Sequence, residues 1–176
     1  MKKSIILATA CIVSTLALSQ AAQTAASSSA SLYQQGQAAE KAGDPVAAQS
    51  FYEKSLKADP NNANARYSLG QIKIHGPKIA AKGREEKFGA VMIPVFQLNE
   101  ATLQEALDAL GVIVEKESKE EVAPNFVIED PKETLADRKI TLSLKAMPAK
   151  AVMKYLMEQS GAKARYDEHA VVVTAK

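Results

Sequence analysis

One pattern of apolar residues occurs twice in the second half of the chain. Residues 96–110 read FQLNEATLQEALDAL, and residues 142–156 read LSLKAMPAKAVMKYL. In each segment, apolar residues at every second position give way, after a short turn, to apolar residues spaced three and four apart. The first spacing is typical of a strand with one buried face, and the second of a helix with one buried face. Neither strand–helix unit can bury its apolar surface alone, so the pattern predicts a core that both units share.

Three further segments complete the predicted order of elements. Short apolar runs at residues 126–128, 164–166 and 170–174 predict strands, and the last two form a hairpin around residues 167–169. The expected order is β-α-β-β-α-β-β. We interpret residues 91–176 as a small α+β domain, a two-layer sandwich.

This half of the chain resembles the secretin and TonB N-terminus (STN) domain, a short periplasmic module of secretins and of TonB-dependent receptors. The matching residues are IPVF at 93–96, TLQEAL at 102–107, ITLSL at 140–144, AV at 151–152 and VVV at 171–173. The resemblance implies a role in protein–protein docking within secretion, pilus-assembly or TonB-type systems of the cell envelope. The charged insert at residues 115–124 is longer than the usual link, so a binding surface there can differ from that of the family.

The first half contains an internal repeat. The sequence YQQGQ at residues 33–37 is echoed by YSLGQ at residues 67–71, an offset of 34 residues. This is the period of a tetratricopeptide (TPR) helix–turn–helix unit. Residues 29–76 resemble about one and a half TPR repeats, with small, small, aromatic and proline residues at Gly36, Ala48, Tyr52 and Pro60; Gln35 and Ser55 depart from the family pattern. So short an array cannot bury a core of its own and is expected to lean on the rest of the chain, on a second copy or on a partner.

Local signals predict where these helices begin and end. Asp44 followed by Pro45 is typical of an N-cap and a first helical position, and Gly43 is typical of a helix end. Gly76 and Pro77 predict the end of the third helix. Residues 77–90 are charged and contain glycine, and we expect them to form an interdomain linker.

The N-terminus has the features of a secretory signal peptide. Lys2 and Lys3 precede an apolar run at residues 5–18, and small residues at 19 and 21 predict cleavage after Ala21. The apolar run is too short to form a stable membrane span. Cys11 lies within this segment, where it is either part of the apolar run or the acceptor of a lipid anchor; the first interpretation fits better. The expected location is therefore the periplasm.

Charge and composition exclude several functions. Removal of Lys2 and Lys3 takes the formal charge from +2 to 0, so no general attraction to nucleic acid is expected. Cys11 is the only cysteine, which leaves the mature chain without a thiol or a disulfide. The two histidines lie in different domains, and no phosphate loop or Gly-x-Ser-x-Gly turn occurs. We expect no metal, no cofactor and no enzymatic activity.

Three groups of residues are candidates for binding. In the TPR-like segment, Tyr33, Gln37, Tyr67 and Gln71 map by the resemblance to a peptide-binding groove; alternatively, they pack between helices. The glutamates between residues 115 and 121 are either a cation site or, more simply, a solvated helix end, and the methionines at 147, 153 and 157 either line a groove or belong to the core. A free strand edge in the C-terminal domain is a further docking surface, although the sequence does not identify the strand.

The expected function is that of a secreted, periplasmic, non-enzymatic adaptor that binds protein partners in the cell envelope. The chain has no membrane span in this interpretation, and a homo-oligomer is possible. The alternative is a periplasmic sensor that binds a small ligand or a cell-wall fragment between its two domains. A sizeable interdomain pocket with convergent polar groups would distinguish the sensor.

Overall fold

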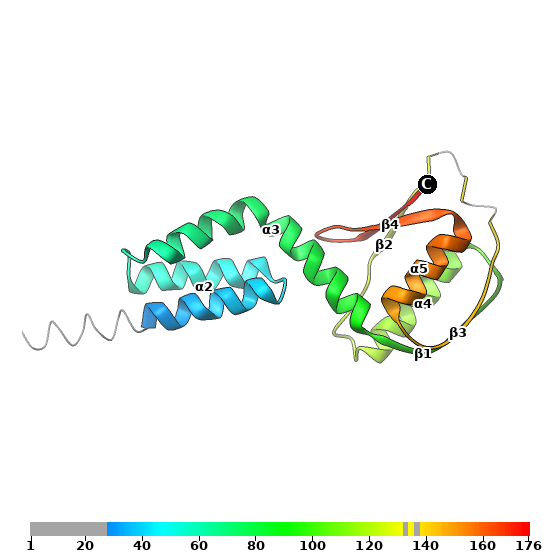
Figure 1. Cartoon of the computed structure of the whole chain (residues 1–176), viewed down its shortest axis with the longest axis horizontal. Helices are drawn as coiled ribbons and strands as arrows, with labels where there is room; N and C mark the ends of the chain where they lie inside the picture. Colours follow the sequence, from blue (N-terminus) through cyan, green and yellow to red (C-terminus); the bar gives the residue numbers. More distant parts are fainter. Residues whose placement is uncertain (1–27, 132–133, 136–137) are drawn as a thin grey trace, which may run out of the picture. The chain divides into compact units, whose positions relative to one another are not determined.

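The computed structural model describes residues 28–131, 134–135 and 138–176 (Figure 1). The predicted signal peptide, its cleavage site and Cys11 lie outside the described residues. The chain is a mixed α+β protein that divides into two compact units, with the boundary between Gly76 and Pro77. Within the described ranges, no helix combines the length and the apolar character needed to cross a membrane.

The first unit consists of helices whose ends follow the predicted signals. They are a helix that includes residues 28–41, then α2 (Pro45–Ala58) and the beginning of α3 (Ala63–Ala90). The side chain of Asp44 accepts a hydrogen bond of 2.9 Å from the backbone N–H of Ala47, and Pro45 is the first residue of α2. Gly43 has φ 72°, a left-handed conformation that favours glycine after a helix. The predicted caps are confirmed.

Tyr52 is the centre of packing in this unit. Its side chain is 0% exposed, and its hydroxyl donates a hydrogen bond of 2.8 Å to Oε2 of Glu40. Burial, followed by the neighbouring Glu40 carboxylate, raises the pKa of Tyr52 far above its ordinary value. Gly36 lies directly against the ring: a Cβ atom at this position would overlap Tyr52. The absence of a side chain at residue 36 therefore lets the first helix and α2 approach closely.

The predicted end of the third helix is wrong. Gly76 and Pro77 lie inside α3, which continues to Ala90, so residues 77–90 are helical. Proline inside a helix costs about 3 kcal/mol, because it removes one hydrogen bond and crowds the preceding turn. Packing on both sides of Pro77 offsets this cost: Ile72 is buried in the first unit, and Phe88 is buried in the core of the second.

The second unit has the predicted order of elements, β-α-β-β-α-β-β. After the end of α3 come β1 (Met92–Ala101), α4 (Leu103–Glu117), β2 (Phe126–Glu129), β3 (Ile140–Pro148), α5 (Ala149–Ser160), β4 (Ala162–Tyr166) and β5 (Val171–Ala175). Thr102, at the N-cap of α4, forms a capping box with Glu105. Gly161, with φ 67°, caps the end of α5.

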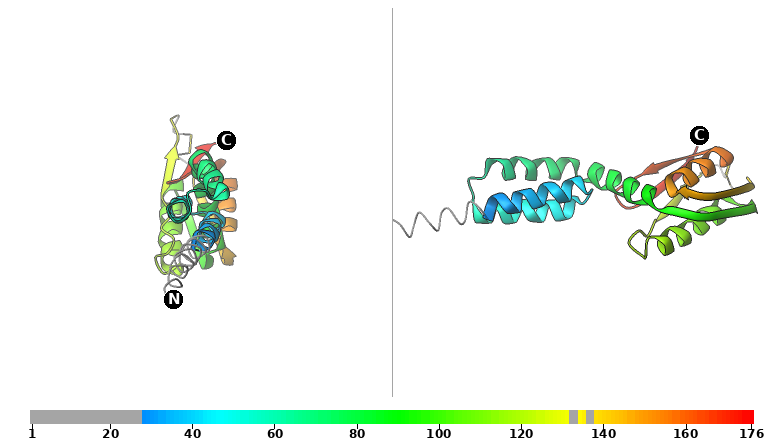
Figure 2. Two further views of the ribbon diagram at one scale, coloured as in Figure 1. Left: turned by 90° about the vertical axis from the view of Figure 1, so that its left-hand side faces the viewer. Right: turned by 60° about the horizontal axis from the view of Figure 1, so that its bottom comes forward.

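The described strands form two small sheets. β1 and β3 form an antiparallel pair, and the second sheet has the order β2-β5-β4, with β2 parallel and β4 antiparallel to β5. The helices α4 and α5 lie beside each other (Figure 2). Helix α4 contacts β1 and β2, and α5 contacts β1, β3 and β4, so both helices touch both sheets. Since the strands are divided between two sheets, the predicted two-layer sandwich is not confirmed. Periodicity within a strand predicts its buried face but does not say which strand becomes its neighbour.

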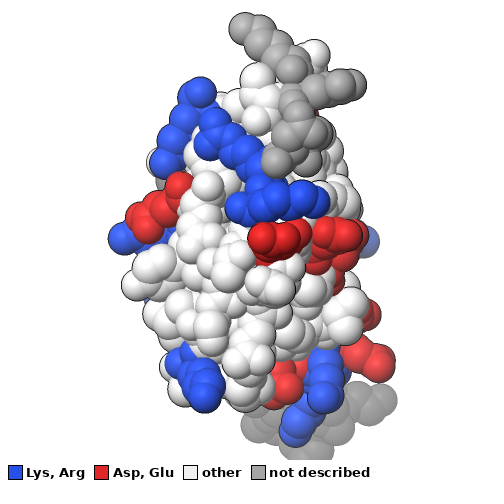
Figure 3. Space-filling model, turned by 90° about the vertical axis from the view of Figure 1, so that its right-hand side faces the viewer, with Lys and Arg blue, Asp and Glu red and all other residues white. Residues whose placement is uncertain are grey.

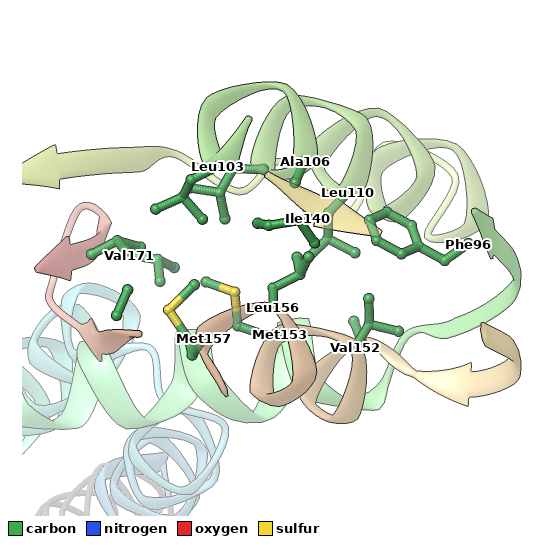
Figure 4. Packing of buried hydrophobic residues seen from close by; sticks show 14 of the residues in the cluster. Phe96, Leu103, Ala106, Leu110, Ile140, Val152, Met153, Leu156, Met157 and Val171 are labelled. Atoms are coloured by element: carbon green, nitrogen blue, oxygen red, sulfur yellow. The ribbon is translucent and has the colours of Figure 1, made fainter. Parts of the chain in front are cut away.

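The apolar faces of both strand–helix units meet in one core, as predicted. The close view shows side chains of α4 and α5 pointing toward each other, with Ile140 of β3 between them (Figure 4). Leu103, Leu107, Leu142 and Leu156 are all buried in this cluster. At about 25 cal/mol per Å² of apolar surface, such burial supplies most of the stability of the unit. The core fixes the positions of α5 and β4, which together line a groove on the surface.

Candidate functional site

The four residues predicted to line a groove in the first unit lie in two unlike environments. Gln37 donates a hydrogen bond of 3.0 Å from Nε2 to the hydroxyl of Tyr33, whose ring lies 5.6 Å from that of Tyr52. Tyr33 therefore takes part in packing between helices, whereas Gln37 is exposed and contacts it from outside. Tyr67, on α3, is 69% exposed, and Gln71 is half-buried. That the four form one peptide-binding groove remains a prediction.

The strand with a usable free edge is β4. It pairs with β5 on one side, and no described strand pairs with its other side. Two hydrogen bonds just beyond the ends of the β4–β5 pair show which residues of β4 bond to β5. One runs from the Lys176 N–H to the Gly161 carbonyl, and the other from the Asp167 N–H to the Ala170 carbonyl. In an antiparallel pair, residues alternate between bonding to the neighbouring strand and pointing away from it. The backbone groups of Ala164 and Tyr166 consequently point toward the unpaired side.

An open groove of about 560 Å³ runs beside this edge, between α5 and β4. Residues from both faces of β4 line it, among them Lys163 from one face and Ala164 from the other, so the groove follows the edge of the strand. The helix side contributes Met153 and Met157, which also belong to the core. Met153 and Met157 therefore serve the core and the groove at once, whereas Met147 is partly buried against the core and is not part of the groove lining.

The rim of the groove is cationic. Four of its lining residues are lysines, at positions 150, 154, 163 and 176, and Glu158 has the only acidic side chain among the lining residues. Lys150 is held 2.6 Å from Oε1 of Glu85, whereas Lys154 lies a loose 3.9 Å from Glu158. Because lysines outnumber acidic side chains in the lining, the rim favours an anionic ligand. The methionine side chains are long and flexible, so they can adapt to ligand side chains of different shapes.

Tyr166 lines the groove at the end of β4. Its ring lies 5.9 Å from that of Phe88, and burial, with the nearby Glu85 carboxylate, raises the pKa of Tyr166 to about 12. The phenol is therefore protonated at neutral pH. It can donate a hydrogen bond to a ligand, and it lacks the near-neutral pKa of an efficient general base.

Other reactive groups lie apart from this groove. Among the residues that the structure describes, no three His, Cys, Asp or Glu side chains are grouped to hold a metal ion. His169 is exposed, and its Nε2 lies 3.8 Å from Oε2 of Glu168. The glutamates at 115, 117, 120 and 121 are exposed at and beyond the end of α4.

The other free edges are less suited to a ligand. β1 and β3 pair only with each other, and β2 pairs only with β5, so each of these strands also has an unpaired side within the described chain. Around the side of the second unit seen in Figure 3, cationic and anionic side chains lie beside one another at the margins of an uncharged area. Mixed charges of this kind do not select the sign of a partner.

The sequence contains a signal that indicates which strand lies at the edge of the sheet. Val171, Val172 and Val173 are consecutive apolar residues, and a run without alternation is typical of a strand buried on both faces. All three are buried, and β5 is the central strand. A central β5 in a hairpin with β4 leaves β4 as a candidate edge.

Comparisons with known proteins identify no relative. Neither a scan of protein-family models nor searches of curated proteins and solved structures give a match to this chain. The groove, its free backbone groups and its charge are therefore the features that indicate a function.

Proposed function

We propose that this chain is a periplasmic, non-enzymatic adaptor of the cell envelope that captures an extended segment of a protein partner along β4. The observation that carries the proposal is the coincidence of a free strand edge, an apolar groove and a lysine rim on the same side of one strand. Addition of a strand to a sheet edge is a common mode of peptide recognition, in which backbone bonds supply affinity and side-chain pockets supply specificity.

The relation to the two families is part of the proposal. The order of elements and the single core of the second unit support the resemblance to an STN domain. The packing of Tyr52 against Gly36 and the cap formed by Asp44 support the resemblance to TPR helices. In this proposal, the partner belongs to a secretion, pilus-assembly or TonB-type complex.

The groove is needed because backbone bonds alone are too weak. Ala164 and Tyr166 each offer one N–H and one C=O to a docked strand, and a hydrogen bond contributes a net of about 0.5–1.5 kcal/mol. Association costs about 4–15 kcal/mol in lost translational and rotational freedom. Apolar anchors must make up the difference, and each apolar side chain buried against Met153 and Met157 contributes about 1.5–3 kcal/mol.

The expected ligand follows from these contacts. It is an extended segment with apolar residues at alternate positions, which point into the groove, and with Asp or Glu beside them, which meet Lys154 and Lys163. Alternation is required because successive side chains of a strand point to opposite faces.

A displayed library of random peptides, selected on the mature chain, tests the proposal. Selected peptides should show the alternation and the acidic residues, and the double variant Lys154→Glu, Lys163→Glu should lose most of their binding. Lys116→Glu, at the end of α4, is the matched control and should bind like the wild type. Selection of peptides without acidic residues, or binding that the double variant retains, would refute the assignment of the groove.

The periplasmic location has a separate test. Expression of the full chain in a Gram-negative host should give a periplasmic protein whose intact mass corresponds to a chain that begins at residue 22. A protein of full mass in the cytoplasm would overturn the location while leaving the peptide result intact.

A further inference from the structure

The structure contains the same helical notch twice, and the residues that the structure describes fill only one copy. We define a notch as a tyrosine and a glycine three residues apart on one helix face. The first is formed by Tyr33 and Gly36, and the second by Tyr67 and Gly70 on α3, at the repeat offset of 34 residues. Residues three apart lie on the same side of a helix, so tyrosine and glycine together form one shallow surface.

The first notch shows what such a surface accepts. The ring of Tyr52, from the following helix, lies 5.6 Å from the ring of Tyr33 and against the Cα of Gly36. A side chain at residue 36 would overlap it. The notch is therefore a receptor for an aromatic ring carried by an antiparallel helix.

The second notch is open. Beyond its own helix, no heavy atom of the described residues would lie within 4 Å of a Cβ atom at Gly70, and Tyr67 is 69% exposed. One turn further along the same face, Ile74 is also 69% exposed. By the repeat, the ring that corresponds to Tyr52 would come from residue 86, which is a glutamate within α3 itself. The helix that should fill this notch is thus not the next segment of the chain.

Glycine at residue 70 is also costly where it is. Inside an exposed helix it is destabilising relative to alanine, and no neighbour within the described chain requires its small size. The same residue type at position 36 is explained by a ring in contact with it. A group from outside the chain that packs against Gly70 would explain the glycine there in the same way.

The charge of α3 selects the occupant. From residue 63 to residue 76 the helix carries Arg66 and Lys73 and contains no aspartate or glutamate. A second copy would bring the same cations to the interface, whereas an acidic helix would complement them. We propose that the face formed by Tyr67, Gly70 and Ile74 binds an amphipathic helix of a partner protein, with an aromatic residue at its centre and acidic residues beside it.

This surface goes beyond the β4 groove, because it lies in the first unit and recognises a helix in place of an extended segment. Binding at one surface does not depend on the other in this proposal. An adaptor with both surfaces can hold two different partners at once.

The probe for the test is a synthetic peptide of residues 44–59, which includes α2 and Tyr52. It is titrated into the ¹⁵N-labelled mature chain, and backbone amide shifts are recorded. We expect shifts that cluster on residues 66–75, and stronger binding when Lys54→Glu and Lys57→Glu are introduced into the peptide. The same peptide with Tyr52→Ala should give no clustered shifts.

Variants of the protein complete the test. Gly70→Leu should abolish the shifts, because the added side chain fills the notch, whereas Gly70→Ser should weaken them at least severalfold. Circular dichroism checks that both variants fold. Shifts centred on Gly36, or shifts that persist in Gly70→Leu, would mean that the peptide replaces α2, and they would overturn the proposal. A dimer that Gly70→Leu dissociates in sedimentation would instead assign the face to a second copy and would also overturn it.

Discussion

The two glycines of the repeat allow one prediction with its own internal control. Gly36→Ala and Gly70→Ala make the same chemical change at equivalent positions of two helices. In a helix interior, alanine is more favourable than glycine by about 0.8–1.0 kcal/mol, and this gain applies to both variants. Because it cancels between them, the difference in stability between the two variants reports the local environment alone.

The environments are opposite. The Cβ atom that Gly70→Ala adds would point into open space, so this variant should stabilise the first unit by about 1 kcal/mol. The Cβ atom that Gly36→Ala adds would overlap the buried ring of Tyr52, and overpacking of this kind costs about 1–3 kcal/mol. A displaced ring also loses its hydrogen bond to Glu40, a further net loss of about 0.5–1.5 kcal/mol. We therefore expect Gly36→Ala to be less stable than Gly70→Ala by about 1.5–4.5 kcal/mol, the sum of these two losses.

Urea unfolding followed by circular dichroism at 222 nm measures the difference, and hydrogen exchange of the amides in residues 28–58 assigns it to the first unit. A second change, Tyr52→Leu, should remove most of the difference, because it takes away the ring that the new methyl group meets. Equal stability of Gly36→Ala and Gly70→Ala would refute the packing of Tyr52 on Gly36. It would also remove the reason for regarding Gly70 as an open notch.

Three further predictions concern the second unit. Leu156→Ala should lower its stability by about 2–5 kcal/mol in urea unfolding, because Leu156 is fully buried between the strand–helix units; a loss below about 1 kcal/mol would mean that the core is not shared. Gly161→Ala should cost about 1 kcal/mol, because alanine is strained at φ 67°, and an unchanged midpoint would argue against the left-handed cap. The backbone N–H and then the hydroxyl of Thr102 hold the pKa of Glu105 below its ordinary value. A group with a lowered folded-state pKa stabilises the fold above its unfolded pKa and loses this effect as the pH falls through the folded value. Glu105→Gln should therefore flatten the acid side of the stability profile, and a profile identical to the wild type would contradict the capping box.

Helix ends and apolar faces could be predicted from the sequence, because local chemistry decides them. Asp44 and Thr102 cap helices through side chains that reach the backbone only three residues away. The stripes that include Leu107 and Leu156 follow from helix periodicity, and their burial in one core follows from the need to cover both. These interactions span a few residues, so a single segment contains all the information that fixes them.

Pairing and close approach could not be predicted, because they depend on residues far apart in the chain. Pro77 remains inside a helix since packing at Ile72 and at Phe88 outweighs its local cost. The groove exists only because β5 pairs with both β2 and β4 and leaves the outer edge of β4 beside α5. The repeat identified Gly36 and Gly70 as equivalent residues. Only the tertiary structure shows that one of them contacts an aromatic ring and the other faces open space, because the difference lies in what the rest of the chain brings to each helix.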